Sequence, residues 1–344
     1  MVNDPNTLFR LPLNYLHYIS YIAVASSPCN LLNVTAFNIM KDLDLTQLPS
    51  QAGKIILVTG GTSGLGRELV KCLAALGPAK IFFTGRNQAR ADEILADLNH
   101  RYPNVQTKFA QIDLASLSDI QRAVQLLIPQ LDGRLDVLIC NAGIMATPPG
   151  LSPDGYEIQW ATNFLGHALL TKYLLPILTT TASSFGDARI INTTSEGLML
   201  APTDKGIVFG DLKTKQEYGF GARWRRYGQS KLAQVLYTSQ LAQRYPTVSS
   251  IAIHPGVVGT DLVSKLGWAD WLLVYATAKV IKPEDGCKNS MWGATVPRKA
   301  IQNGAYYSPI AEPGKQTKWT QDEDLGNRLW HWTEEALRPF VGHA

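Results

Sequence analysis

The chain has 344 residues, of which 45% are hydrophobic and 17% charged, and its formal net charge is +4 at pH 7. This composition excludes a disordered or fibrous protein, and the modest charge gives no reason to expect a nucleic acid partner. The cysteines Cys29, Cys72, Cys140 and Cys287 lie far apart in the sequence, and no His/Cys/Asp cluster has metal-ligand spacing, so we expect free thiols, a reducing compartment and no metal site.

Residues 1–50 are expected to form an extension that precedes the main domain at residues 51–344. Within the extension, residues 14–25 are apolar and aromatic but too short and too polar to span a bilayer. The flanking residues and the cysteine usage argue against a cleaved signal peptide. We expect a docked helix or loop in a cytoplasmic protein, with peripheral contact to an intracellular membrane as the alternative.

From residue 54 onward, short apolar runs typical of buried strands alternate with helical patterns. The expected strands are residues 54–59, 80–84, 105–112, 135–140, 188–193 and 248–254, with residues 305–307 as a candidate seventh. The expected helices are residues 67–76, 89–100, 117–127, 156–178 and 227–244. This alternation predicts a Rossmann-type α/β fold, a doubly wound parallel sheet of about seven strands with helices on both faces.

Two stretches, residues 196–226 and 261–300, interrupt the alternation. Both follow strands at the sheet edge where open α/β folds bind ligands, so we expect them to cover the substrate. The second stretch contains Trp268 and Trp271 in a pattern typical of an amphipathic helix. A hydrophobic lid and a membrane-facing patch are both compatible with it, and either one predicts a lipophilic substrate.

A glycine-rich turn joins the first expected strand to the first expected helix. Its pattern is Gly60-x-x-x-Gly64-x-Gly66, with Ser63 and Leu65 in the loop. Glycines at this place let the backbone approach a pyrophosphate, which then sits at the helix N-terminus. The turn therefore predicts a dinucleotide site.

The end of the second expected strand bears on which dinucleotide is bound. NAD sites usually place an acidic residue here, whereas an arginine accommodates the 2′-phosphate of NADP. The sequence reads Thr84-Gly85-Arg86-Asn87, and the first acidic residue downstream is Asp92. We therefore predict NADP(H), with Arg86 at the 2′-phosphate.

Tyr227 and Lys231 lie four positions apart in a helical pattern, which places both on one helix face. A lysine beside a tyrosine stabilises the phenolate and lowers the tyrosine pKa from about 10 towards neutrality. The pair therefore suits acid/base chemistry on an alcohol and carbonyl couple.

Four motifs occur in the order Thr59-Gly60-x-x-x-Gly64-x-Gly66, Asn141-Ala-Gly143, Ser195, Tyr227-x-x-x-Lys231. Over roughly residues 53–310, this combination resembles the short-chain dehydrogenase/reductase family in its single-domain branch. The wide separation of the serine from the tyrosine and the run at residues 254–260 are similar to retinol-dehydrogenase-like members. That group includes fungal reductases of secondary metabolite biosynthesis.

The resemblance implies roles for individual residues. The catalytic set is Ser195, Tyr227, Lys231 and Asn163, in which the serine binds the substrate oxygen and the asparagine supports a relay water to the lysine. Thr193 and Thr194 compete with the serine for its role. The cofactor-binding set is Gly60, Ser63, Gly64, Leu65, Gly66, Arg86, Asp113, Asn141, Gly143, Tyr227, Lys231, Val258 and Thr260.

We expect an NADP(H)-dependent oxidoreductase that interconverts an alcohol and a ketone or aldehyde on a lipophilic small molecule, with a homo-oligomer as an open possibility. The alternatives are a catalytically silent NADP-binding regulator and an isomerase or epimerase on the same fold. His167 and His254 are expected to be structural. The run Arg223-Trp-Arg-Arg226 is expected to be a solvated rim, with contact to an acidic substrate or to a membrane surface as the alternatives.

Overall fold

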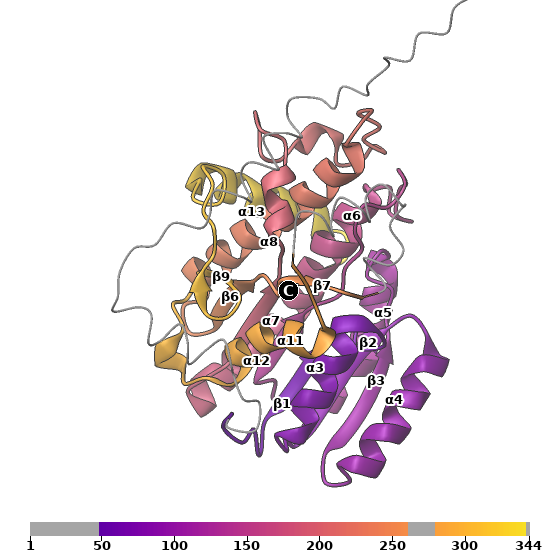
Figure 1. Cartoon of the computed structure of the whole chain (residues 1–344), viewed down its shortest axis with the longest axis vertical. Helices are drawn as coiled ribbons and strands as arrows, with labels where there is room; N and C mark the ends of the chain where they lie inside the picture. The colour runs from indigo at the N-terminus through magenta and orange to yellow at the C-terminus, as the bar shows by residue number, and fades with distance from the viewer. Residues whose placement is uncertain (1–47, 261–278, 342–344) are drawn as a thin grey trace, which may run out of the picture.

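An eight-stranded sheet forms the centre of the computed structural model, which describes residues 48–260 and 279–341. The strand order is β10-β9-β6-β5-β4-β1-β2-β3 (Figure 1). The strands are β1 Ile55–Val58, β2 Lys80–Gly85, β3 Gln106–Gln111, β4 Val137–Cys140, β5 Arg189–Thr193, β6 Ser249–Ile253, β9 Tyr306–Ser308 and β10 Glu312–Pro313. The strands run parallel, apart from the antiparallel pair β9–β10. The Rossmann-type prediction is confirmed, with eight strands instead of about seven because β10 adds a short edge.

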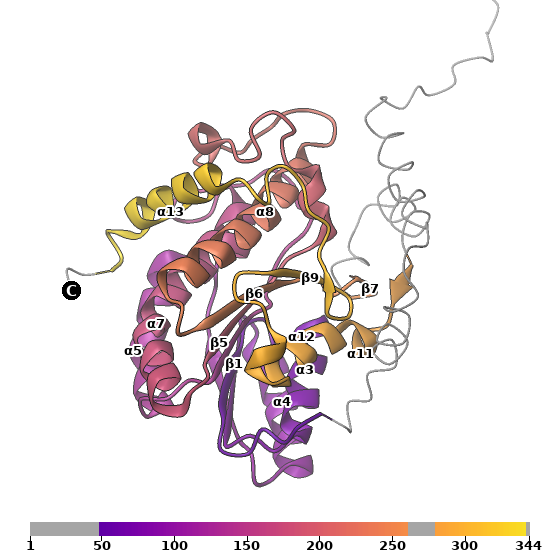
Figure 2. The same cartoon turned by 90° about the vertical axis from the view of Figure 1, so that its left-hand side faces the viewer.

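Helices connect the strands and cover both faces of the sheet. The longer ones are α3 Gly64–Ala75, α4 Gln88–Arg101, α5 Leu117–Leu127, α7 Gly166–Phe185, α8 Ala222–Arg244, α12 Lys288–Thr295 and α13 Glu323–Leu337. The shorter ones are α6 Ile158–Trp160 and α11 Pro283–Gly286. A second, two-stranded sheet pairs β7 Val257–Val258 with β8 Val280–Ile281. Figure 2 shows α5, α7, α8 and α13 on one side of the main sheet and α3, α11 and α12 on the other.

The core consists of two apolar layers, one on each face of the sheet. Alternate side chains of a strand enter opposite layers, because successive side chains of a strand point to opposite faces. In β1, Leu57 packs with α5, α7 and α8, while Ile56 and Val58 pack with α3, α4 and α12. Packing on both faces fixes the positions of the strands, so their carboxyl ends meet at one edge of the sheet. The loops that follow the strands lie at this edge.

Side-chain caps fix where several helices begin. Asn87, Ser116 and Asp322 each accept a hydrogen bond from a backbone N–H of the first turn of α4, α5 and α13. The predicted helix at residues 156–178 is instead two helices joined by a π-helical turn, Ala161–Leu165, and it extends to Phe185. The predicted helix at 227–244 begins five residues earlier, at Ala222. Helix α13 is an additional element that the sequence patterns did not indicate.

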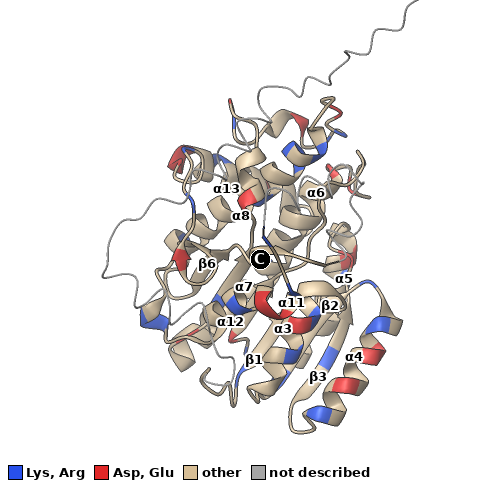
Figure 3. Ribbon diagram, viewed as in Figure 1, with Lys and Arg blue, Asp and Glu red and all other residues tan. Residues whose placement is uncertain are grey.

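The segment at residues 14–25 and the tryptophans Trp268 and Trp271 lie outside the described residues. In the part that is described, no helix is both long enough and apolar enough to cross a membrane. Figure 3 shows charged residues of both signs interspersed along helices such as α4.

Candidate active site

A cavity of about 1250 Å³ opens at the carboxyl ends of the parallel strands. One half is lined by the glycine turn before α3 and by the loops after β2, β3 and β4, and the other by residues 195–203 and by the start of α8. Strand β1 lies between β4 and β2, so the chain reverses its direction of winding here, which is where open α/β sheets bind ligands. Every predicted cofactor residue lines this cavity, as does Ser195.

The glycine turn is packed too tightly for larger side chains. A Cβ on Gly66 would lie 2.3 Å from the Gly60 carbonyl oxygen and 2.5 Å from Asn141 Nδ2. Gly60 has a φ of +70°, which favours glycine. Ser63, the N-cap residue of α3, makes no side-chain capping hydrogen bond, so the first-turn N–H groups remain available at the cavity wall. Such a helix start suits a phosphate group.

Strands β2 and β3 end at the far side of this half of the cavity. Arg86 directly follows β2 and lines the cavity, while Asn87 caps α4 by accepting from Arg90 N at 3.0 Å. Asp113 follows β3, and its Oδ1 accepts from Ala115 N at 3.0 Å. The group that follows β2 at the cavity is therefore a guanidinium and not a carboxylate.

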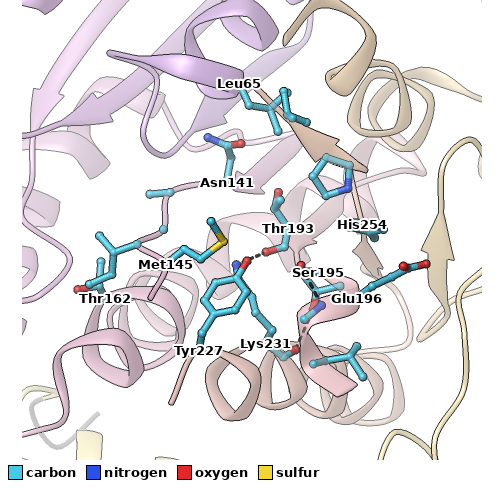
Figure 4. A pocket seen from close by; sticks show the side chains of 18 of the residues that line it. Leu65, Asn141, Met145, Thr162, Thr193, Ser195, Glu196, Tyr227, Lys231 and His254 are labelled. Atoms are coloured by element: carbon cyan, nitrogen blue, oxygen red, sulfur yellow. Dashed lines mark hydrogen bonds between the residues drawn. The ribbon is translucent and has the colours of Figure 1, made fainter. Parts of the chain in front are cut away.

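Tyr227 and Lys231 face the cavity from the first turns of α8 (Figure 4). Their side chains are 5% and 4% exposed, and the lysine Nζ lies 5.7 Å from the centroid of the tyrosine ring. Lys231 Nζ donates to Thr193 O at 2.8 Å. Burial lowers the lysine pKa to about 7, because the apolar surroundings disfavour the charged form. The ammonium is therefore poised between its two protonation states near neutral pH.

Ser195 lies beside the tyrosine at the end of β5. Its Oγ accepts from Gly197 N at 3.1 Å, which fixes the start of the short helical turn that follows. A Cβ on Gly197 would lie 2.7 Å from Tyr227 Cε1 and 3.3 Å from Ser195 Oγ, so the serine hydroxyl lies near the ring edge. Of its competitors, Thr194 donates to Lys231 O at 2.8 Å and is buried. The hydroxyl of Thr193 is also buried and has no hydrogen-bond partner among the described residues.

Asn163 lies behind the cavity wall, in the π-helical turn. Its Oδ1 accepts from Ile144 N at 2.8 Å, and its Nδ2 donates to Ile144 O and to Ser230 Oγ, both at 2.9 Å. Its backbone carbonyl accepts from Gln234 Nε2 at 3.0 Å and pairs with His167 Nδ1 at 2.9 Å. Asn163 therefore joins the loop after β4 to α8, and the relay water stays a prediction.

Comparisons with known proteins agree with this geometry. A family model described as short chain dehydrogenase matches residues 54–203. The short-chain dehydrogenase/reductase drtF of Aspergillus calidoustus is 35% identical over 85% of this chain and 96% of its own length. The chain belongs to the short-chain dehydrogenase/reductase family. As a member of it, the protein is an oxidoreductase that acts on CH–OH groups.

Two further comparisons concern a second relative and a solved structure. The polyprenol dehydrogenase of Mus musculus is 32% identical over 85% of this chain and 85% of its own. The solved structure of an NADPH-bound carbonyl reductase from chicken fatty liver is 23% identical, covers 79% of this chain and 97% of its own, and has a TM-score of 0.58. This structure shares the short-chain dehydrogenase/reductase fold.

For Arg226, the prediction of a solvated position was wrong. The run before the catalytic-type tyrosine was predicted to be a solvated rim, but the Arg226 side chain is 1% exposed. It donates to Gln216 O at 3.0 Å and to Thr147 O at 2.9 Å, and its Nε lies 3.1 Å from the buried Glu157 carboxylate. It therefore joins three segments around the start of α8. The burial of Arg226 was missed because the sequence groups it with exposed arginines, and its position directly before the predicted catalytic tyrosine was the available sign of a structural role.

The two histidines that were expected to be structural, His167 and His254, are both buried, but only His254 lines the cavity. His167 lies within α7, where its Nε2 pairs with Thr59 Oγ1 at 2.8 Å. His254 follows β6 and lines the cavity, and its Nδ1 has no hydrogen-bond partner in the described part of the chain. Burial lowers the pKa of each to about 4, so both rings are neutral at physiological pH.

Proposed function

We propose that the protein is an NADP(H)-dependent oxidoreductase that interconverts an alcohol and a ketone or aldehyde on a lipophilic small molecule. The observation that carries this proposal is the placement of Tyr227, Lys231 and Ser195 on the wall of the cavity that continues to the glycine turn. The glycine turn would hold the pyrophosphate of the dinucleotide, and this wall would then lie within the same cavity as the bound cofactor.

The chain's own residues supply proton transfer and polarisation. Bound nicotinamide supplies the hydride chemistry. In the direction of reduction, Tyr227 Oη donates a proton to the substrate oxygen, and the Ser195 hydroxyl donates a hydrogen bond to the same oxygen. Protonated Lys231 lowers the pKa of the phenol and so favours the proton transfer. In oxidation, the phenolate takes the proton from the alcohol.

Turnover of a Tyr227→Phe variant tests the acid/base assignment. The substitution keeps the ring and removes the hydroxyl, so we expect loss of turnover with nearly unchanged NADPH affinity. Tyr237→Phe, at a tyrosine that is buried in α8 outside the cavity lining, is the matched control and keeps activity. Retained turnover in Tyr227→Phe contradicts the assignment. A wild-type protein that binds NADPH but reduces no carbonyl favours the silent regulator.

Arg86 supports the choice of NADP(H) over NAD(H). A guanidinium pairs well with a phosphate, and such charge-assisted hydrogen bonds contribute about 1.5–3 kcal/mol. We expect wild-type protein to bind NADPH more tightly than NADH, and Arg86→Ser to lose about 10–100-fold in NADPH affinity without a matching loss for NADH. Arg225→Ser, which removes an arginine at the other half of the cavity, should leave the preference intact. A wild-type preference for NADH refutes the assignment.

The half of the cavity beyond Ser195 combines large apolar side chains with polar and charged ones such as Glu196, Arg225 and Lys318. The apolar side chains that line it are Met145, Leu198, Met199, Leu200, Phe220, Trp224 and Trp319. Long methionine and leucine side chains adapt to an apolar substrate of irregular shape. A panel of lipophilic ketones and alcohols, followed at the nicotinamide absorbance, tests this class against small polar carbonyls. Equal or better turnover of the polar compounds contradicts it.

A further inference from the structure

Two thiols that are far apart in the sequence meet on the face of the sheet that carries α3. Cys72 lies in α3 and Cys287 lies between α11 and α12. Their Sγ atoms are 3.8 Å apart. Both are free thiols, as the sequence predicted, but their contact was not expected. A disulfide bond has a sulfur–sulfur distance of about 2.0 Å, so modest movement brings them to bonding distance.

The two thiols have different environments. Cys72 is partly exposed, whereas Cys287 is completely buried. The hydrogen bond with Cys287 lowers the pKa of Cys72, and nearby Lys71 adds to this effect. The contact with Cys72 and burial raise the pKa of Cys287. Cys72 is therefore the thiol that reaches solvent and ionises more readily, and Cys287 is held against it as a partner.

We propose that Cys72 and Cys287 form a reversible disulfide when the protein meets a hydroperoxide. In the first step the Cys72 thiolate attacks a peroxide oxygen, the O–O bond breaks, and a sulfenic acid forms while the leaving oxygen is protonated to an alcohol, or to water where the oxidant is hydrogen peroxide. In the second step Cys287 Sγ attacks the sulfenic sulfur, loses its proton, and water leaves. Overall, two thiols are oxidised by two electrons to one disulfide, and one hydroperoxide is reduced. A dithiol reductant reverses the change.

The position of Cys287 connects this disulfide to the cavity. The preceding residue, Gly286, packs so closely that a Cβ there would lie 2.5 Å from Val258 Cγ2 and 3.2 Å from Leu65 Cδ1. Both of these side chains line the cavity beside the glycine turn. Figure 1 shows α11 next to α3. Movement of Cys287 towards Cys72 would shift α11 against Val258 and Leu65, in the half of the cavity that contains the glycine turn. We therefore expect weaker dinucleotide binding.

Thiol mapping of the full-length protein tests the bond itself. Protein treated with hydrogen peroxide is alkylated, digested without reductant and analysed by mass spectrometry. We expect a peptide pair that joins Cys72 to Cys287 and disappears after dithiothreitol. Cys140→Ser is the control, because Cys140 is buried in β4 and it should still give the pair. Thiols that stay free, or bonds that join other cysteines instead, overturn the proposal.

NADPH titration of the reduced and oxidised forms tests the consequence. We expect the oxidised form to bind about fivefold more weakly, which corresponds to roughly 1 kcal/mol of lost contact. Cys72→Ser and Cys287→Ser should bind NADPH alike before and after peroxide, and equal affinities of the two wild-type forms overturn the link to the cavity. This second measurement rests on the proposed cofactor, whereas thiol mapping does not, so the two failures are distinguishable.

Discussion

Replacing Lys231 with methionine should abolish turnover and stabilise the fold near neutral pH. Methionine keeps an unbranched apolar side chain but removes the amine. Lys231 is 4% exposed, and burial lowers its pKa from 10.5 to about 7. The folded protein therefore holds a lysine in surroundings that disfavour its charged form.

The size and pH dependence of the effect follow from the protons bound in each state. Between pH 7 and 10.5 the unfolded lysine is protonated while the folded one is neutral, so wild-type stability rises with pH. Below pH 7 both are protonated, and the shift from 10.5 to about 7 costs the folded state about 5 kcal/mol. Methionine also leaves Thr193 O without a donor, at about 1–3 kcal/mol. The variant should gain about 2–4 kcal/mol below pH 7 and lose about 1–3 kcal/mol by pH 10.5.

Urea unfolding of wild type and Lys231→Met at about pH 6.5, 8.5 and 10 measures this difference. The expected sign change between the lowest and highest pH is the decisive feature. Lys205→Met, which removes an exposed lysine, is the matched control and should show no such trend. A free-energy difference that stays constant across this pH range refutes the account of a buried, pKa-shifted lysine.

Two other substitutions test contacts around the site. In Gly197→Ala, the new Cβ would lie 2.7 Å from Tyr227 Cε1, so we expect reduced kcat with little change in NADPH affinity; unchanged kcat would show that the ring is free to shift. Arg226→Lys keeps a positive charge opposite Glu157 but cannot donate to both carbonyl oxygens. We expect about 2–4 kcal/mol less stability in urea and a raised substrate KM, whereas unchanged values for both would mean that Arg226 does not hold the cavity wall.

Local sequence patterns were enough to predict the elements that form the half of the cavity containing the glycine turn. A glycine turn must follow a strand and precede a helix, and the turn at residues 60–66 is confirmed at that position. Strand ends meet at one sheet edge in any parallel array, so the sequence alone places residues as distant as Arg86 and Ser195 in one region, and both line the cavity. These inferences depend on backbone geometry, which short patterns encode well.

Contacts between distant side chains were not predictable in the same way. Arg226 reads like its exposed neighbours Arg223 and Arg225, and only the fold brings Glu157 to it. The contact between Cys72 and Cys287 likewise joins α3 to the link between α11 and α12, and these segments follow different strands. The helix at residues 323–337 was missed because no strand follows it, although Asp322 caps it in the usual way. Each case requires knowing which helices share a face of the sheet.

One hydrogen-bonded chain explains how the two halves of the cavity stay aligned. The Asn163 carbonyl can only accept, so His167 Nδ1 carries the proton, and its Nε2 accepts from the Thr59 hydroxyl. Thr59 Oγ1 in turn accepts from the backbone N–H of Asn141 and Ala142. These bonds run from the ends of β1 and β4 to α7, and Asn163 continues them to α8 through its bonds to that helix. The low pKa of His167 keeps this tautomer neutral at physiological pH. The glycine turn and the helix that carries the tyrosine and lysine are therefore held in one register by polar contacts as well as by apolar packing.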